Sequence, residues 1–476
     1  MNGPCFGRGG HVEELGVLHM RGILWGLAAT FLSACLAAPA AADRFRLSDA
    51  LALAYTYNPE LEAQRAKVRQ ADDVVAEARG GWRPSVNGSA SYGVSNFSGT
   101  QLGVIPRTET LTPLDGRASV SQPVITGGQA YAQVQRAIAQ VRAARADLLN
   151  AEQQVLLAAA TAYMDVVRDV IALRLHEEDV TILSKQRDAT KAQLDAGAAT
   201  KTDLQEVEVR IAGAQADLAL AQSQLTQSRN SFERIIGRPA ETLEEIPPMP
   251  ALPASLDQAM ALALRLAPRI QAAQANDKAA QYGIDNAEGA MLPHASIVAQ
   301  YDYVQGSLAS PFGINSKGGT LSLLGQLSVP LYQGGADTAR LREAKEAKAQ
   351  AHLSIADSDQ ATRQTTKDGW AAFHAALTAV GYNEHRVTAS EQALDGVIQQ
   401  QHQGERSILD ILNAEQERLA AQIALAGSRH DMVVTSYQLL SAVGELTAKW
   451  LNLKVKIYDP NEHYNENSAS WLDFGG

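Results

Sequence analysis

Four segments of the chain alternate between apolar and polar side chains with a period of two. They lie in pairs, at about 85–100 and 112–124 and at about 294–308 and 318–331. In the third segment, the alternation sets Ile297, Ala299, Tyr301 and Tyr303 against Ser296, Gln300 and Asp302. Successive side chains of a strand point to opposite faces, so this pattern predicts strands with one apolar and one polar face, as in strands that cross a membrane.

The longest predicted elements are helices. No Gly or Pro occurs from Gln129 to Ala196, so one helix there would reach roughly 100 Å at about 1.5 Å per residue. In the next segment, every seventh position is apolar at Leu204, Ile211, Leu218 and Leu225, and Val207, Ala214 and Ala221 follow three positions later. This spacing is typical of a coiled coil, and small Ala side chains let neighbouring helices approach closely.

The whole pattern occurs twice along the chain in a nearly constant register. Pro59 matches Pro268 near the start of the two copies, and Asp203 matches Asp410 near their ends. A register held across so much chain indicates an internal duplication. The expected regions are an N-terminal extension and signal peptide at 1–42, a first repeat at 43–246, a Pro-rich linker at 247–255, a second repeat at 256–457 and a polar tail at 458–476.

The N-terminal region predicts export from the cytoplasm. Arg21, an apolar run at 23–38 and the small residues at 40–42 form a signal peptide with cleavage before Asp43. Met20 directly precedes this signal, so translation could start there as well as at Met1.

The chain has 2 Cys, Cys5 and Cys35, and both precede the predicted cleavage site. The mature chain would therefore contain no disulfide. Residues 32–35 also resemble a lipoprotein cleavage box, so acylation of Cys35 is the alternative to its removal.

Composition and motifs exclude several classes of function. The formal net charge of -11 would repel nucleic acid. The pairs Gly127-Gly128 and Gly334-Gly335 lack the Lys-Ser/Thr of a phosphate loop. The 10 His are dispersed rather than spaced as metal ligands. We therefore predict no catalytic residues, no cofactor and no metal. After Ala42 no run of 18 or more apolar residues occurs, so strands would have to cross any membrane.

Four strands cannot close a barrel, which needs at least about eight, so several chains would have to supply it.

Three motifs then stand out on the duplicated framework: Asn58-Pro59-Glu60-Leu61, Gln122-Pro123-Val124 before Gly127-Gly128, and Val329-Pro330-Leu331 before Gly334-Gly335. In these motifs and their order the chain resembles the TolC family over nearly its whole mature length. The resemblance implies a mainly α fold with a membrane β-barrel portion. In such a homotrimer, twelve strands, four per chain, form one outer-membrane barrel that a long periplasmic coiled-coil barrel continues.

The same resemblance implies a passive exit duct in the outer membrane that extends through the periplasm. Its partners would be outer-membrane lipid, a periplasmic adaptor (membrane fusion) protein and an inner-membrane ABC or proton-driven transporter. The segment 455–464 and Trp471 are similar to the ending of the type I secretion branch, which favours protein export. A dedicated multidrug efflux channel is the alternative. A periplasmic coiled-coil scaffold without a pore is a further reading that the strands and the duplication disfavour.

By resemblance, the helix breaks at Gly197 and Gly404 lie at the periplasmic tip. The turns that would face the adaptor are Gly197, Ala198, Ala199 and Thr200 in the first repeat and Gly404, Glu405, Arg406 and Ser407 in the second.

The resemblance also implies a gate just beyond these turns. Asp203 would pair with Arg406 between neighbouring helix pairs, and Asp410 would face the pore in an acidic ring that favours cations. From the residues alone, each Asp is more readily interpreted as an acid in the first turn of a helix, stabilised by the helix dipole, and only the family resemblance favours the gate. Two positions depart from the family pattern. Asn413 replaces a frequent second pore acid and Gln401 replaces a common aromatic, so closure and cation binding would both be weaker.

Overall fold

The computed structural model describes residues 45–101, 105–245, 247–306 and 317–467. The expected signal peptide with Cys5 and Cys35, and Trp471 near the C-terminus, lie outside these residues.

The two halves of the chain fold into the same succession of helices. The first half contains α1 (Leu47–Tyr57), α2 (Pro59–Gly80), α3 (Gln129–Asp195) and α4 (Lys201–Ile236). The second contains α5 (Leu256–Leu266), α6 (Pro268–Gly289), α7 (Ala336–His402) and α8 (Ile408–Val443), followed by α9 (Glu462–Asn467). The long helices α3 and α7 each have 67 residues, and α4 and α8 each have 36. Within the described ranges, no helix combines the length and the apolar character needed to cross a membrane.

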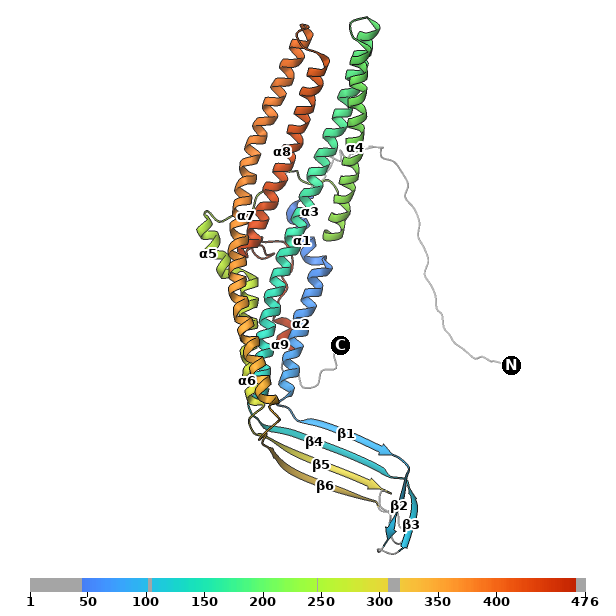
Figure 1. Cartoon of the computed structure of the whole chain (residues 1–476), viewed down its shortest axis with the longest axis vertical. Coiled ribbons are helices and arrows are strands. Elements are labelled where there is room, and N and C mark those ends of the chain that lie inside the picture. Colours follow the sequence, from blue (N-terminus) through green and yellow to red (C-terminus); the bar gives the residue numbers. More distant parts are fainter. Residues whose placement is uncertain (1–44, 102–104, 246, 307–316, 468–476) are drawn as a thin grey trace, which may run out of the picture. The chain divides into compact units, whose positions relative to one another are not determined.

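The long helices form two hairpins, α3 with α4 and α7 with α8 (Figure 1). Helix α3 also packs along α2 and α6, and α6 packs along α7. Asn58 shows why α1 ends and α2 begins at this point of the chain. Its side chain accepts a hydrogen bond from the backbone N–H of Glu60 at 2.9 Å, and Pro59 occupies the first helical position, where a missing N–H costs nothing.

Four antiparallel strands form one sheet in the order β1-β4-β5-β6. They are β1 (Ser85–Tyr92), β4 (Leu114–Thr126), β5 (His294–Gln305) and β6 (Lys317–Ser328). Both repeats contribute two strands, and β4 of the first repeat pairs with β5 of the second. The expected mainly helical fold with a strand portion is confirmed.

A second, two-stranded sheet was not expected from the sequence. It is the hairpin of β2 (Ser95–Gln101) and β3 (Ile105–Leu111), which falls inside and just beyond the predicted strand at 85–100. Strand β1 of the first sheet ends at Tyr92. The backbone N–H of the next residue, Gly93, donates to the carbonyl of Pro113 at 3.1 Å. β2 and β3 are rich in polar and β-branched residues and show no clear alternation, so the pattern that marks the other strands does not identify this hairpin.

The main hydrophobic core lies where α1, α3, α4 and α8 meet the segment that follows α8. Tyr163 and Phe232 are fully buried there, with ring centroids 6.4 Å apart. The Tyr163 hydroxyl donates to the carbonyl oxygen of Phe45 at 2.7 Å and accepts from the backbone N–H of Glu244 at 2.9 Å. This side chain therefore ties both the start of the described chain and the segment after α4 to α3.

Candidate functional site

Both hairpin turns have the same backbone construction. After α3, Gly197 adopts a left-handed φ of 74°, and the N–H of Ala198 bonds to the carbonyl of Gln193 at 2.8 Å. After α7, Gly404 has a φ of 78°, and the N–H of Glu405 bonds to the carbonyl of Gln400 at 3.0 Å. This arrangement ends a helix by satisfying its last carbonyls, and glycine adopts the left-handed conformation at little cost. The two predicted tips are thus tight, matched turns.

A reciprocal cap begins the helix after each turn. Thr200 donates from its backbone N–H to Asp203 Oδ2 at 2.7 Å, and the N–H of Asp203 donates to Thr200 Oγ1 at 3.2 Å. Ser407 and Asp410 repeat this arrangement at 2.9 and 3.3 Å. Such a box satisfies N–H groups that have no partner within the helix. The backbone hydrogen bonds from Thr200 and Ser407 hold the pKa of each Asp carboxyl below its usual range.

The remaining predicted gate residues lie at the second turn. Arg406 Nη1 lies 3.6 Å from Asp410 Oδ1, and Arg406 Nε donates to Gln400 Oε1 at 3.2 Å. Gln401 supplies the carbonyl that accepts from the N–H of Gly404. Asp203 and Arg406 thus each bond within their own turn in this single chain. The pairing of these two residues between neighbouring helix pairs stays a prediction.

Sequence reasoning missed Arg210, which joins the two repeats. Its Nη2 donates to Asn413 Oδ1 at 2.9 Å, and its Nη1 donates to Gln416 Oε1. A signal for this residue existed, because Arg210 directly precedes Ile211 in the seven-residue repeat. Charged residues that flank the apolar positions of a coiled coil often bond to another helix.

Sequence reasoning also missed a polar network farther along the helices. His430 of α8 is 8% exposed, with Nε2 lying 3.0 Å from Asp165 Oδ1 of α3 and Nδ1 lying 2.9 Å from Asp431 Oδ1. Arg168 lies 3.0 Å from Asp165 and 2.8 Å from Asp169. Burial alone would lower the pKa of His430, but its interactions with Asp165 and Asp431 outweigh burial, so the pKa is raised. The contact of His430 with Asp165 therefore joins α8 to α3, and the raised pKa favours the protonated imidazole.

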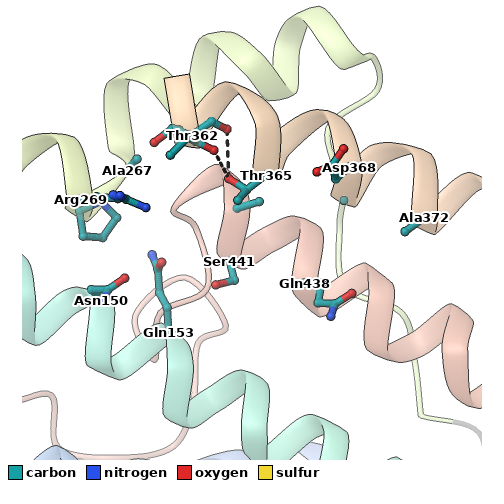
Figure 2. Close-up of a pocket in the computed structure, with 14 residues that line it drawn as sticks. Asn150, Gln153, Ala267, Arg269, Thr362, Thr365, Asp368, Ala372, Gln438 and Ser441 are labelled. Carbon is teal, nitrogen blue, oxygen red and sulfur yellow. Dashed lines mark hydrogen bonds between the residues drawn. The ribbon is translucent and has the colours of Figure 1, made fainter. Parts of the chain in front are cut away.

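A polar recess of about 480 Å³ opens where α8 ends and α6 begins, between α3 and α7 (Figure 2). Its labelled polar side chains are Asn150, Gln153, Arg269, Thr362, Thr365, Asp368, Gln438 and Ser441. The Thr365 hydroxyl is satisfied within α7, because it donates to the carbonyl of Ala361 at 3.0 Å. The recess offers hydrogen bonds to water or a polar solute. Across the described residues, no group of three or more His, Cys, Asp or Glu is placed to hold a metal ion.

The four-stranded sheet presents an apolar face to its surroundings. One row across β1, β4, β5 and β6 consists of Val86, Val120, Ala299 and Leu323, and the next of Gly88, Ala118, Tyr301 and Leu321. Val86 is 73% exposed and Leu323 is 76% exposed. The other face carries polar groups, including the pair of Arg117 Nε and Asp302 Oδ1 at 2.7 Å. A continuous exposed apolar face of this kind is typical of a surface that contacts lipid or another protein.

Comparisons with known proteins give one consistent result. The outer membrane efflux protein family matches residues 50–238 and 259–445. The outer membrane efflux protein BepC of Brucella suis biovar 1 is 34% identical over 447 residues, covering 94% of this chain and 95% of that protein. The proteases secretion protein PrtF of Dickeya chrysanthemi is 27% identical over 454 residues, covering 90% and 92%. The crystal structure of the Campylobacter jejuni CmeC outer membrane channel is similar in fold, with a TM-score of 0.74, 15% identity and 89% of each chain covered.

Proposed function

Because the chain belongs to the outer membrane efflux protein family and is an outer-membrane channel, we propose that it works as a homotrimeric exit duct for cargo driven from the inner membrane. The observation that carries this proposal is the four-stranded sheet with its exposed apolar face. β1 and β6 are its edge strands, and no further strand pairs with either of them within the described residues. Open edges are costly in lipid, where no water satisfies backbone N–H and carbonyl groups.

Closure by neighbouring copies removes these edges. If β6 of one chain pairs with β1 of the next, three chains supply twelve strands, which lies within the range of outer-membrane barrels. The apolar rows of β1, β4, β5 and β6 then contact outer-membrane lipid, and the polar rows line the interior. The helix hairpins continue the duct through the periplasm, which accounts for their length of roughly 100 Å.

The partners of this duct are a periplasmic adaptor and an inner-membrane transporter, since a passive channel needs an external energy source. We assign the adaptor contact to the two matched turns at 197–200 and 404–407. Type I protein secretion is the favoured role, because the relatives include PrtF, whose name assigns it to secretion of proteases. Small-molecule efflux through the same duct is the second role, because BepC is named an efflux protein.

Disulfide trapping between edge strands tests the trimer. A Cys at Thr320 of β6 is combined in turn with a Cys at Ser85, Asn87, Ser89 or Ser91 of β1. Four pairs are needed because the stagger of the barrel sets which β1 residue lies opposite Thr320 of the neighbouring chain. Protein in outer-membrane fractions is oxidised and run without reductant. At least one pair should give a ladder that stops at three chains. Cys at Asn87 and Ser119, which are partners within one chain, should give no ladder. A ladder that stops at two chains or continues past three contradicts the trimer.

The cargo is tested in a strain that lacks this chain. Loss of an exported protein from the medium, restored by the native gene, supports type I secretion. Increased sensitivity to toxic small molecules with protein export intact supports dedicated efflux instead. A strain unchanged in both respects contradicts the exit-duct role.

A further inference from the structure

The two hairpins of one chain meet close to their turns through a contact between α4 and α8. Arg210 of α4 points its guanidinium at two side-chain amides on α8, Asn413 and Gln416. These acceptors lie one turn apart on the same helix face, and a planar guanidinium can reach both at once. The contact therefore fixes the relative position of the two helices in two places.

An apolar contact reinforces this polar one. Leu412 is 3% exposed and belongs to the same apolar cluster as Leu183 of α3 and Val207 and Ile211 of α4. A side chain of the second repeat is thus buried among helices of the first. Leu412 precedes Asn413 and Ile211 follows Arg210, so the apolar and polar contacts form one unit. We call this unit, made of Arg210, Asn413, Gln416 and Leu412, the cross-repeat clamp.

The clamp lies close to the predicted gate. Arg210 follows Asp203 by two turns of α4, which corresponds to roughly 10 Å along the helix axis. Asn413 follows Asp410 by one turn of α8. Any motion that spreads the two hairpins at their turns must therefore release Arg210 from α8.

The chemistry of the clamp suits a contact that opens. The acceptors of Arg210 are neutral amides, and hydrogen bonds between two ionised groups are stronger than those to neutral acceptors. Within the described residues, the ion pairs of Arg side chains on α7 and α8 stay inside one hairpin, as in the pair of Arg386 Nη2 and Glu417 Oε1 at 2.8 Å. Close to the turns, the link between hairpins therefore uses the weaker type of bond, whereas the ion pair of His430 and Asp165 joins α8 to α3 farther along the helices.

We propose that Arg210 is a positioning residue of the gate. In the closed duct it holds the hairpins of each chain together through Asn413 and Gln416, and its hydrogen bonds to α8 must break when the tip opens. This inference rests on the proposed function, because it concerns how that duct is regulated.

Single-channel recordings from purified protein in a planar bilayer test the clamp. Arg210→Gln removes the guanidinium and keeps a good helix former. Losing an exposed polar interaction of this kind changes an equilibrium by about two- to fivefold in total, so the wide state should be occupied about two- to fivefold more. Arg210→Lys, which keeps the charge but loses the planar fork, should fall between native and Arg210→Gln.

Asn413→Asp supplies the sharper test, because it should act in the opposite direction. A carboxylate facing Arg210 strengthens the contact, so the wide state should become rarer than in the native protein. Arg386→Gln is the control, since it removes Arg bonds that stay within one hairpin and should leave gating unchanged.

The outcomes separate the clamp from the duct itself. The clamp proposal is wrong if native channels conduct normally and the two variants, Arg210→Gln and Asn413→Asp, are both unchanged or both shifted in the same direction. This result would leave the duct proposal intact. An equal effect of Arg386→Gln also overturns it. Correctly inserted protein that conducts in no variant overturns the duct, and the clamp falls with it.

Discussion

Replacing Tyr163 by Phe removes a single oxygen atom from the centre of the core. The ring is fully buried, so its packing against Phe232 is kept. The longer contact of the hydroxyl to the carbonyl of Glu244 at 3.1 Å is lost together with its two shorter hydrogen bonds, one to the carbonyl of Phe45 and one from the N–H of Glu244. These two backbone groups still bond to each other at 3.2 Å, which limits the damage.

The size of the effect follows from these contacts. A hydrogen bond contributes about 0.5–1.5 kcal/mol, so Tyr163→Phe should lower the free energy of unfolding by about 1–2 kcal/mol. Tyr163→Ala also removes the ring and should cost about 3–5 kcal/mol. With an unfolding entropy of about 2 cal/mol/K per residue, 1 kcal/mol lowers the thermal midpoint of a chain of this length by about 1 °C.

Far-ultraviolet circular dichroism of the purified protein during heating measures both variants. The midpoint should fall by about 1–2 °C for Tyr163→Phe and by about 3–5 °C for Tyr163→Ala. Equal shifts for the two variants would refute the partition between ring packing and hydrogen bonds. No shift for Tyr163→Phe would show that the hydroxyl contributes no net stability.

Three further predictions concern the turns and the helix contacts. Thr200→Ala removes the cap of α4 at a cost of about 1 kcal/mol, so hydrogen exchange in the first turn of α4 should accelerate about fivefold; unchanged exchange contradicts the cap. Gly127 has a left-handed φ of 59°, and a Cβ there would overlap the carbonyl oxygen of Gly289, whereas nothing lies near a Cβ at Gly128. Gly127→Ala should therefore reduce folded protein in the outer membrane more than Gly128→Ala, and equal yields would contradict the close approach. The raised pKa of His430 means that its pairing stabilises the fold below the ordinary imidazole pKa of about 6.5 and is lost as pH rises through the raised value. The pKa of Asp165 is lowered, because its interactions with His430 and Arg168 outweigh burial, so its contribution is lost as pH falls through that lowered value. The thermal midpoint of the native protein should exceed that of His430→Gln most at mildly acidic pH, and a difference that grows with rising pH would contradict this sign.

Most of the fold could be predicted from the sequence, because local pattern determines it. The absence of Gly and Pro after Gln129 predicts α3, and Gly197 and Gly404 end helices where a left-handed residue is needed. The second sheet could not be predicted, since β2 and β3 are mostly polar and lack the alternation that marks β1 and β4.

The candidate site was predicted less completely, because its contacts depend on which helices lie side by side. Asp203 and Asp410 stand in the first turns of helices, as their sequence position alone suggests, and each completes the capping box of its helix. Arg210 and His430 bond to residues about 200 and more positions away. No local pattern specifies such partners, although the position of Arg210 beside an apolar repeat hinted at a contact with another helix.

The most direct test of the duct is the conductance of the purified native protein in a planar bilayer, compared with Arg406→Ala. A duct closed by Arg406 should show small, cation-selective openings that become larger when Arg406 is removed. Unchanged conductance in Arg406→Ala would contradict only the predicted pairing with Asp203 and would leave the channel function supported. The absence of any conductance from folded, membrane-inserted protein would contradict the central claim that this chain forms a duct.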